Sequence, residues 1–307
     1  MRALLIVNPR ATATTPRVRD VIARALDSVV KLDVAETGRR GHAIELARQA
    51  AVDGVEVVVS LGGDGTVNEV VNGLLTTGPS PHLPALAVVP AGSTNVFARN
   101  VGLSRDPVEA TSEIVGALQR GRTRRIGLGR MDERWFTFCA GVGLDAEVIR
   151  RVECRRRHGA RATAPLVVRS AFAQFLTLTE RRHPPLRLER PGAAPVEGLF
   201  NALVSNTAPW SYVGDRPVNP SPAASFDGGL DLLALRRMRL PGTLWTVAQM
   251  LDAHPQPHGH RLFLLHDQPE ITFYADRPMA VQVDGDYLGE RECVRLASVP
   301  DALRVVC

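Results

Sequence analysis

The first 125 residues alternate short apolar runs with segments of helical spacing. The apolar runs occupy 3–7, 32–37, 55–61 and 84–90, and the helix-like segments occupy 16–29, 41–52, 66–75 and 107–121. Strands that are apolar on both faces and separated by helices are typical of a parallel sheet covered on both sides. The alternation therefore predicts an α/β domain of three layers.

The pattern changes after Arg122. Short strand-like pieces separated by Gly, Pro and Asn follow, at 124–131, 134–143, 185–190, 198–206, 228–238, 270–275 and 279–289. Two helical segments, 166–182 and 240–251, interrupt them. This texture predicts a β-rich, sandwich-like second domain. We place the domains at 1–124 and 125–307 and leave open whether the final residues return to the first domain.

Composition limits the class of protein. No run approaches the ~18 consecutive apolar residues of a membrane-spanning helix. The four cysteines are scattered without a CxxC pair, and we find no secretory leader, so we expect reduced thiols and a cytoplasmic protein. Lys31 is the one lysine, and 36 of the 37 basic residues are arginine.

The stretch LGGDGTVNEVVNG, 61–73, follows the third predicted strand and runs into a helix predicted to begin at Thr66. Glycine lets the backbone approach a ligand closely, and a helix N-terminus favours an anion. Asp64 would repel a phosphate unless a cation such as Mg²⁺ lay between them. The stretch therefore predicts a nucleotide phosphate site with magnesium, and the alternative is a tight turn in which Asp64 caps the helix.

Two common phosphate-binding motifs are missing from the sequence. There is no GxxxxGK[ST], so the stretch is not a P-loop, and no GxGxxG follows the first strand, so a dinucleotide fingerprint is missing too.

Six blocks in order resemble one kinase family. GGDGT followed by VNEVVNGL (67–74) resembles the phosphate-binding loop of lipid kinases. The other blocks are VNP (7–9), VVPAGSTNVFARNVGL (88–103), GVGLDAEV (141–148), FDGGLDLLAL (226–235) and VQVDGD (281–286). The chain resembles the diacylglycerol kinase catalytic-domain family of bacterial diacylglycerol- and sphingosine-type lipid kinases, over nearly its whole length.

The resemblance implies an ATP- and Mg²⁺-dependent kinase whose active site lies in a cleft between the two domains. It implies Asp286 as the base for the acceptor hydroxyl, supported by Asp284, with Asp64 acting through magnesium and Asp227 in a separate structural metal turn. We expect Asp284 and Asp286 to share one face of a strand, although Asp-Gly is also a common hairpin turn. The implied nucleotide-binding set is Asn8, Thr37, Gly62, Gly63, Asp64, Gly65, Thr66, Asn68, Glu69, Gly92, Ser93 and Asn95.

The sequence departs from the family pattern at two positions. Asp286 stands where the family generally has Glu, and Val96 stands where it often has Asp. A carboxylate misplaced by about 1 Å can cost roughly 10²-fold in rate. These changes keep open a catalytically weak homologue that senses a nucleotide or lipid. An NAD kinase is a further alternative, although the segments NEVVNG and VDGD fit that family poorly.

A lipid kinase needs an apolar pocket and access to a membrane. The segment 166–178 offers apolar side chains, and the run Arg150–Arg161 carries six arginines that would attract an anionic membrane. A solvated helix face explains that run equally well. We expect no nucleic-acid partner, because no aromatic stacking platform accompanies the basic residues. The oligomeric state stays open, a homodimer included.

Overall fold

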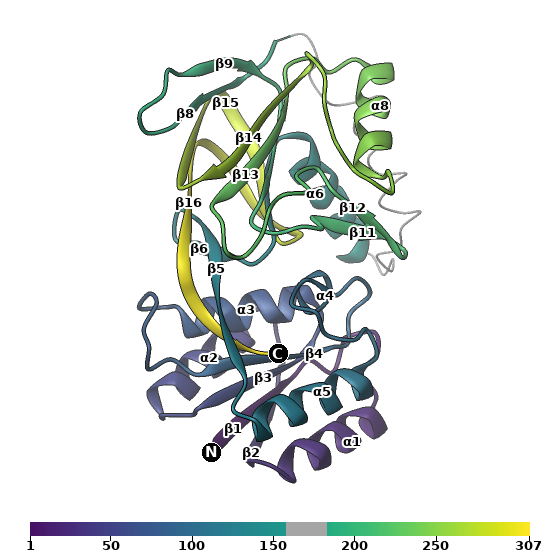
Figure 1. Cartoon of the computed structure of the whole chain (residues 1–307), viewed down its shortest axis with the longest axis vertical. Coiled ribbons are helices and arrows are strands. Elements are labelled where there is room, and N and C mark those ends of the chain that lie inside the picture. Colours follow the sequence, from purple (N-terminus) through teal and green to yellow (C-terminus); the bar gives the residue numbers. More distant parts are fainter. Residues whose placement is uncertain (158–182) are drawn as a thin grey trace. The chain divides into compact units, whose positions relative to one another are not determined.

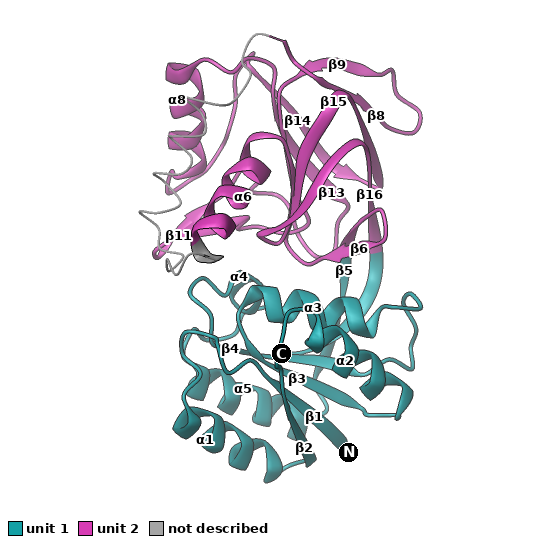
Figure 2. Ribbon diagram, turned by 180° about the vertical axis from the view of Figure 1, so that it is seen from behind, with its two compact units in different colours: residues 1–128, 300–307 teal, residues 129–299 magenta. Residues whose placement is uncertain are grey.

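A computed structural model of the chain describes residues 1–157 and 183–307. The chain divides into two compact units, coloured separately in Figure 2. Unit 1 comprises Met1–Leu128 and Pro300–Cys307, and unit 2 comprises Gly129–Val299. The predicted helix at 166–182 and the apolar residues at 166–178 lie outside the described residues.

Unit 1 is a parallel sheet between two layers of helices (Figure 1). The strand order is β2-β1-β3-β4, and Val305 of the last strand pairs in parallel with Leu86 of β4. Helices α1 and α5 pack together, and α2 packs on α3. The elements are β1 (Arg2–Val7), α1 (Pro16–Asp27), β2 (Lys31–Glu36), α2 (His42–Val52), β3 (Val57–Gly62), α3 (Asp64–Leu74), β4 (Ala85–Pro90), α4 (Val96–Asn100) and α5 (Pro107–Gln119).

The central strands of unit 1 are apolar because they are buried on both faces. Every residue of β3 and β4 is buried. Helix α3 packs closely on α2 through Gly73, where a Cβ would lie 2.4 Å from the Ile44 carbonyl oxygen. The prediction that α3 begins at Thr66 is wrong by two residues: the helix begins at Asp64, after Gly63 as N-cap.

Unit 2 is built mainly of antiparallel strands. Its strands run in the order β14-β13-β10-β7-β15-β16, and β8 also pairs with β15. Strand β15 pairs with β8 through 272–275 and with β7 through 281–283, and residues from both ends enter one core. The remaining strands of the chain are β5 (Thr123–Met131), β6 (Arg134–Phe136), β7 (Cys139–Val142), β8 (Leu186–Glu189), β9 (Val196–Leu199), β10 (Ala202–Ser205), β11 (Ser211–Val213), β12 (Arg216–Val218), β13 (Leu230–Leu235), β14 (Leu262–Gln268), β15 (Glu270–Val283) and β16 (Asp286–Val306). Residues 123–128 of β5 and 300–306 of β16 belong to unit 1.

Two described helices accompany these strands, α6 (Leu144–Arg157) and α8 (Leu240–Met250). Helix α8 contributes Met250 to a second, smaller hydrophobic core, which also includes Leu235. Within the two described ranges, no helix has the length and apolar character needed to cross a bilayer.

Candidate functional site

The predicted phosphate site lies at the carboxyl ends of the parallel strands of unit 1. Val7 of β1 pairs with Leu61 of β3, and the next amide, that of Asn8, donates to the Leu61 carbonyl oxygen at 2.9 Å. In the sheet, β1 lies between β2 on one side and β3 on the other. The order in which the strands are added therefore reverses direction at β1. Open α/β sheets bind ligands at such a point of reversal, outside the strand ends.

Gly62, the last residue of β3, and Gly65 in the first turn of α3 have different reasons to be glycine. A Cβ on Gly62 would lie 2.6 Å from the Thr66 hydroxyl oxygen, so the packing of Thr66 excludes a side chain there. A Cβ on Gly65 would meet nothing within 4 Å, and Gly65 is exposed. The first turn of α3 therefore has one open side, where backbone amides without intrahelical partners favour an anion.

The loop after β4 comes into backbone contact with the loop after β3. A Cβ on Gly92 would lie 2.6 Å from the Cα of Gly63. Asn95 has a left-handed backbone, its Oδ1 accepts from the Gly92 amide at 2.8 Å, and its Nδ2 donates to the Gly92 carbonyl at 3.0 Å. Ser93 is exposed at the turn that this side chain closes. The two loops thus form one surface with no side chain between Gly63 and Gly92.

Asn8 and Thr37 complete this edge of the sheet. The Asn8 Nδ2 donates to the Thr66 hydroxyl at 2.9 Å. The Thr37 amide donates to the Val7 carbonyl at 2.8 Å, so Thr37 follows β2 beside the end of β1. The residues predicted from separate segments are therefore neighbours at one edge.

Asp64 links the two loops. Its Oδ1 accepts from the amide of Phe97, in the first turn of α4, at 3.1 Å. The carboxylate is half-buried, at the start of α3. It thus caps the neighbouring helix α4, while the alternative reading of the sequence had it capping its own.

Two members of the predicted set form hydrogen bonds with the helices of unit 1. Glu69 accepts from the amides of Gly41 and Ala43 at 2.8 and 3.2 Å, which caps the start of α2. Asn68 is buried, and its Oδ1 accepts from the side chain of Asn72 at 3.1 Å. Glu69 therefore joins α3 to the start of α2, whereas the Asn68 contact lies within α3.

In unit 2, the motif VDGD forms a tight hairpin. Val283 pairs with Asp286, and Asp284 and Gly285 between them have φ of 47° and 81°. These values are those of a type I′ turn, for which Asp-Gly is a preferred pair. The expectation that Asp284 and Asp286 share one face of a strand is therefore wrong, because Asp284 is a turn residue.

The Asp284 carboxylate is buried and accepts four hydrogen bonds. Its Oδ2 accepts from the amide and hydroxyl of Thr137 at 2.7 and 2.9 Å, and its Oδ1 from the amides of Phe138 and Cys139 at 3.0 and 3.1 Å. The Asp284 amide in turn donates a hydrogen bond to the Cys139 carbonyl oxygen at 2.9 Å. Asp284 therefore fastens the hairpin to the segment that enters β7.

Asp286 stands on the other side of the turn, at the first residue of β16. Its side chain is 21% exposed, and its Oδ2 lies 3.7 Å from the Nη2 of Arg134 in β6. A half-buried carboxylate beside a guanidinium stays accessible to an acceptor hydroxyl. Arg134 was not among the predicted site residues. Its one signal in the sequence is its position directly after the turn at 132–133.

Asp145 and Gln282 form a second polar contact behind the hairpin. The Gln282 Nε2 donates to the Asp145 Oδ2 at 2.8 Å, and the Gln282 Oε1 accepts from the Gly285 amide at 2.9 Å. Residue Asp145 is partly exposed, but its Oδ1 is buried without a hydrogen-bond partner. Burial raises the pKa of this carboxyl to about 7, and the hydrogen bond from Gln282 opposes that rise. A Cβ on Gly141 would lie 2.1 Å from the same carboxylate, which explains the glycine of GVGLD. Asp145 was not among the predicted site residues, and the spacing of Gly141 and Asp145 is the signal from which it could have been found.

The remaining predicted residues are Asp227 and the basic run Arg150–Arg161. Asp227 is exposed in the turn before β13. Across residues 1–157 and 183–307, no group of three or more His, Cys, Asp or Glu side chains could hold a metal ion. Arg150 pairs with Glu290 at 2.9 Å and lies over the ring of Tyr287, while Arg161 falls outside the described residues.

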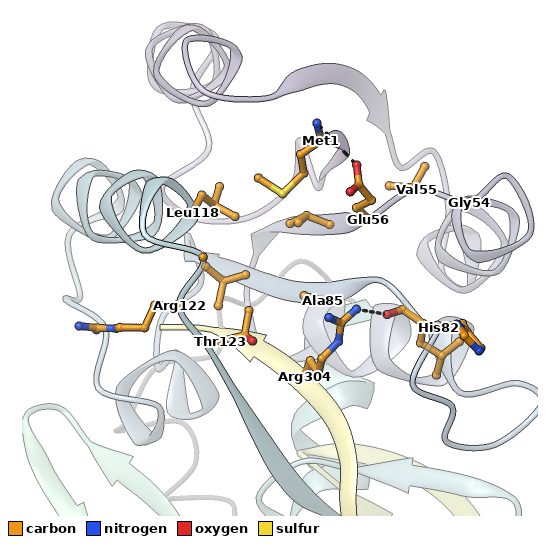
Figure 3. Close-up of a pocket in the computed structure, with 14 residues that line it drawn as sticks. Met1, Gly54, Val55, Glu56, His82, Ala85, Leu118, Arg122, Thr123 and Arg304 are labelled. Carbon is orange, nitrogen blue, oxygen red and sulfur yellow. Dashed lines mark hydrogen bonds and ion pairs between the residues drawn. The ribbon is translucent and has the colours of Figure 1, made fainter.

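A pocket of about 320 Å³ lies at the amino-terminal edge of the parallel sheet (Figure 3). Met1, Val57 and Ala85, at or near the starts of strands, line it together with Arg122 and Arg304. Arg304 donates to the Leu83 carbonyl at 2.8 Å. None of the predicted site residues lines this pocket, and it lies at the wrong ends of the strands for the ligand crevice of an open sheet.

Comparisons with known proteins agree with the resemblance. A model of the diacylglycerol kinase catalytic domain matches residues 2–131. A Chromohalobacter salexigens protein described as "Probable lipid kinase YegS-like" is 37% identical over 301 residues, covering 97% of this chain and 91% of its own. The diacylglycerol kinase of Bacillus subtilis is 26% identical over 249 residues, covering 81% of this chain and 77% of its own.

Solved structures share the fold. A diacylglycerol kinase from Bacillus anthracis has a TM-score of 0.74 at 19% identity, over 99% of this chain and 96% of that one. An NAD kinase from Archaeoglobus fulgidus, in complex with ATP, has a TM-score of 0.54 at 13% identity, over 100% and 94%. The predicted fold class, a parallel-sheet α/β domain with a β-rich second domain, is confirmed. The identity over almost the full length of a lipid kinase relative shows that this chain belongs to the diacylglycerol kinase catalytic-domain family.

Proposed function

We propose that the protein transfers the γ-phosphate of ATP to the hydroxyl of a diacylglycerol-like or sphingoid lipid. The observation that carries this proposal is the backbone contact between Gly63 and Gly92 beside the open first turn of α3. A surface of bare backbone at a helix N-terminus suits the phosphates of a nucleotide. Family membership makes the chain a lipid kinase homologue, and the donor and acceptor are our inference.

The phosphates would lie against the first turn of α3, with Asn8, Thr37, Ser93 and Asn95 at the neighbouring strand ends. The Oδ1 of Asp64 accepts from the Phe97 amide, and this carboxylate would hold Mg²⁺. A single carboxylate fits magnesium in a kinase, because that ion keeps several waters and takes its other ligands from the phosphates. When bound, magnesium would neutralise charge on the transferring phosphoryl group.

Asp286 would take the proton from the acceptor hydroxyl, and Arg134 would orient its carboxylate. Phosphoryl transfer depends mainly on positioning and charge. Asp284 would support Asp286 indirectly, because its four hydrogen bonds hold the turn that precedes Asp286. Asp227 keeps its proposed role in a separate metal turn.

A second candidate function is a nucleotide- or lipid-sensing protein with little turnover. Val96 is buried at the start of α4 and supplies no carboxylate where the family often has one. In this reading the loop would bind ATP, and the shorter Asp286 would not reach the hydroxyl.

The test is transfer of radiolabel from ATP with Mg²⁺ to diacylglycerol, sphingosine, ceramide and NAD in parallel. We expect label in a lipid, lost in Asp64→Ala and Asp286→Asn and kept in the control Asp33→Asn, an exposed residue of β2. Label in NAD would reject the lipid acceptor. ATP binding without transfer to any acceptor, together with a large gain in Asp286→Glu, would favour the sensor.

A further inference from the structure

Helix α8 turns its largest apolar side chains outward. Residues 240–250 contain no charged side chain. Pro241, Leu244, Trp245 and Ala248 are all exposed and follow i, i+3, i+4, i+7 spacing, so they form one stripe, with Val247 beside it. Leu244 is 44% exposed and Trp245 is 64% exposed. Trp245 is the most exposed of the three tryptophans.

The inward face of α8 is more polar than its outward face. The buried residues are Gly242, Thr246, Gln249 and Met250. The Thr246 hydroxyl donates to the Gly242 carbonyl at 3.1 Å, and the Gln249 Nε2 lies 3.2 Å from Nδ1 of His258. A surface helix ordinarily places its apolar stripe on the core. The reversed arrangement indicates that an apolar partner covers the outward stripe.

Exposed positive charge precedes the stripe. Arg236, Arg237 and Arg239 connect β13 to α8 and are all exposed. No Asp, Glu or Lys occurs from 232 to 251, so this segment carries a charge of +3. The partner must therefore be apolar and accept positive charge at its rim.

We propose that α8 and the preceding arginines form the surface with which this protein lies on an anionic lipid bilayer. The inference rests on the proposed lipid-kinase function, which requires access to an acceptor in a membrane. Tryptophan favours the boundary between headgroups and acyl chains, and arginine binds phosphates bidentately. At 11 residues, about 16 Å, the helix is too short to span and would lie in the plane of the interface.

The same charge disfavours a second copy of this chain as the partner. A two-fold dimer would place α8 against α8, because such an interface uses the same patch on both subunits. The three arginines of each copy would then approach those of the other without acidic residues in the segment to offset them.

The experiment is co-sedimentation of the full chain with vesicles of phosphatidylcholine, with and without phosphatidylglycerol. We expect Leu244→Ser combined with Trp245→Ser to weaken binding at least tenfold on vesicles containing phosphatidylglycerol. Arg237→Gln combined with Arg239→Gln should weaken it about 30-fold there and have little effect on phosphatidylcholine alone. The control is Val108→Ser, because Val108 is 50% exposed on α5 in unit 1; it should bind like the wild type.

Tryptophan fluorescence with brominated lipids locates the contact. We expect quenching in the wild type that is lost in Trp245→Phe, a variant that keeps an apolar ring and should still bind. Undiminished vesicle binding by the Leu244/Trp245 variant would overturn the proposal. So would a wild-type dimer that this variant converts to a monomer in sedimentation velocity. Kinase activity on a short-chain diacylglycerol in detergent tests the proposed function separately, because that substrate needs no bilayer.

Discussion

Replacing Asp284 by alanine should destabilise unit 2 more than any change at the neighbouring Asp286. The substitution removes the acceptor of four hydrogen bonds, from the Thr137 amide and hydroxyl and from the amides of Phe138 and Cys139. All three donor residues are buried, with at most 4% of their surface exposed. The three amides would then lose the carboxylate that accepts from them, in a place that water does not reach.

The expected loss in unfolding free energy is about 3–5 kcal/mol. A buried donor without a partner costs roughly 1–3 kcal/mol, and three such amides share one site, so their costs add incompletely. Alanine in the left-handed turn at Asp284 adds about 1 kcal/mol. Asp284→Asn should lose about half as much, because its oxygen still accepts two bonds while its amide group faces a donor.

Urea unfolding followed by tryptophan fluorescence measures this effect in the right part of the chain. All three tryptophans, Trp135, Trp210 and Trp245, lie in unit 2. Asp286→Asn is the matched control and should change the unfolding free energy by less than about 1 kcal/mol, because its ion pair is long and partly exposed. A loss below about 1 kcal/mol in Asp284→Ala would refute the role assigned to this carboxylate.

Two further predictions concern pH and the phosphate loop. Burial raises the pKa of Asp145 from 3.8 to about 7, so between these values the native state keeps a proton that the unfolded state releases. The unfolding free energy should therefore fall by about 3 kcal/mol as pH rises from 4 to 7. Asp145→Asn should remove that fall in urea titrations at pH 4 and 7, and an unchanged difference between the two pH values would contradict it. Gly92→Ala should push the loops apart at Gly63, destabilise unit 1 by about 1–3 kcal/mol and weaken ATP binding in calorimetry at least tenfold. Gly65→Ala, whose Cβ would meet no protein atom within 4 Å, should leave the unfolding free energy of unit 1 within about 1 kcal/mol of wild type, and an equal loss of stability at both glycines would reject the packing argument.

The sequence predicted the α/β class of unit 1 well because β3 and β4 are buried on both faces and therefore apolar throughout. Periodicity located α3 two residues late, because its apolar spacing begins only at Val67 while its first turn is Asp64 and Gly65. Strand β16 was missed beyond Gly289, because long stretches of it are exposed and its pairing with β15 sets its conformation. The sequence indicated helix α6 only as one of two readings of the run Arg150–Arg161, because arginines obscure the few buried apolar residues in it.

Asp284 and Asp286 show why the candidate site could be predicted only in part. The two residues are identical and two positions apart, so local sequence assigns them the same environment. The donors that separate them, at Thr137 and its neighbours, lie about 147 residues away in the chain. Those contacts make Asp284 part of the framework and leave Asp286 half-exposed beside Arg134. A loss of activity in Asp284 variants therefore reports on folding of the hairpin, whereas the same loss in Asp286→Asn with unchanged stability reports on proton transfer.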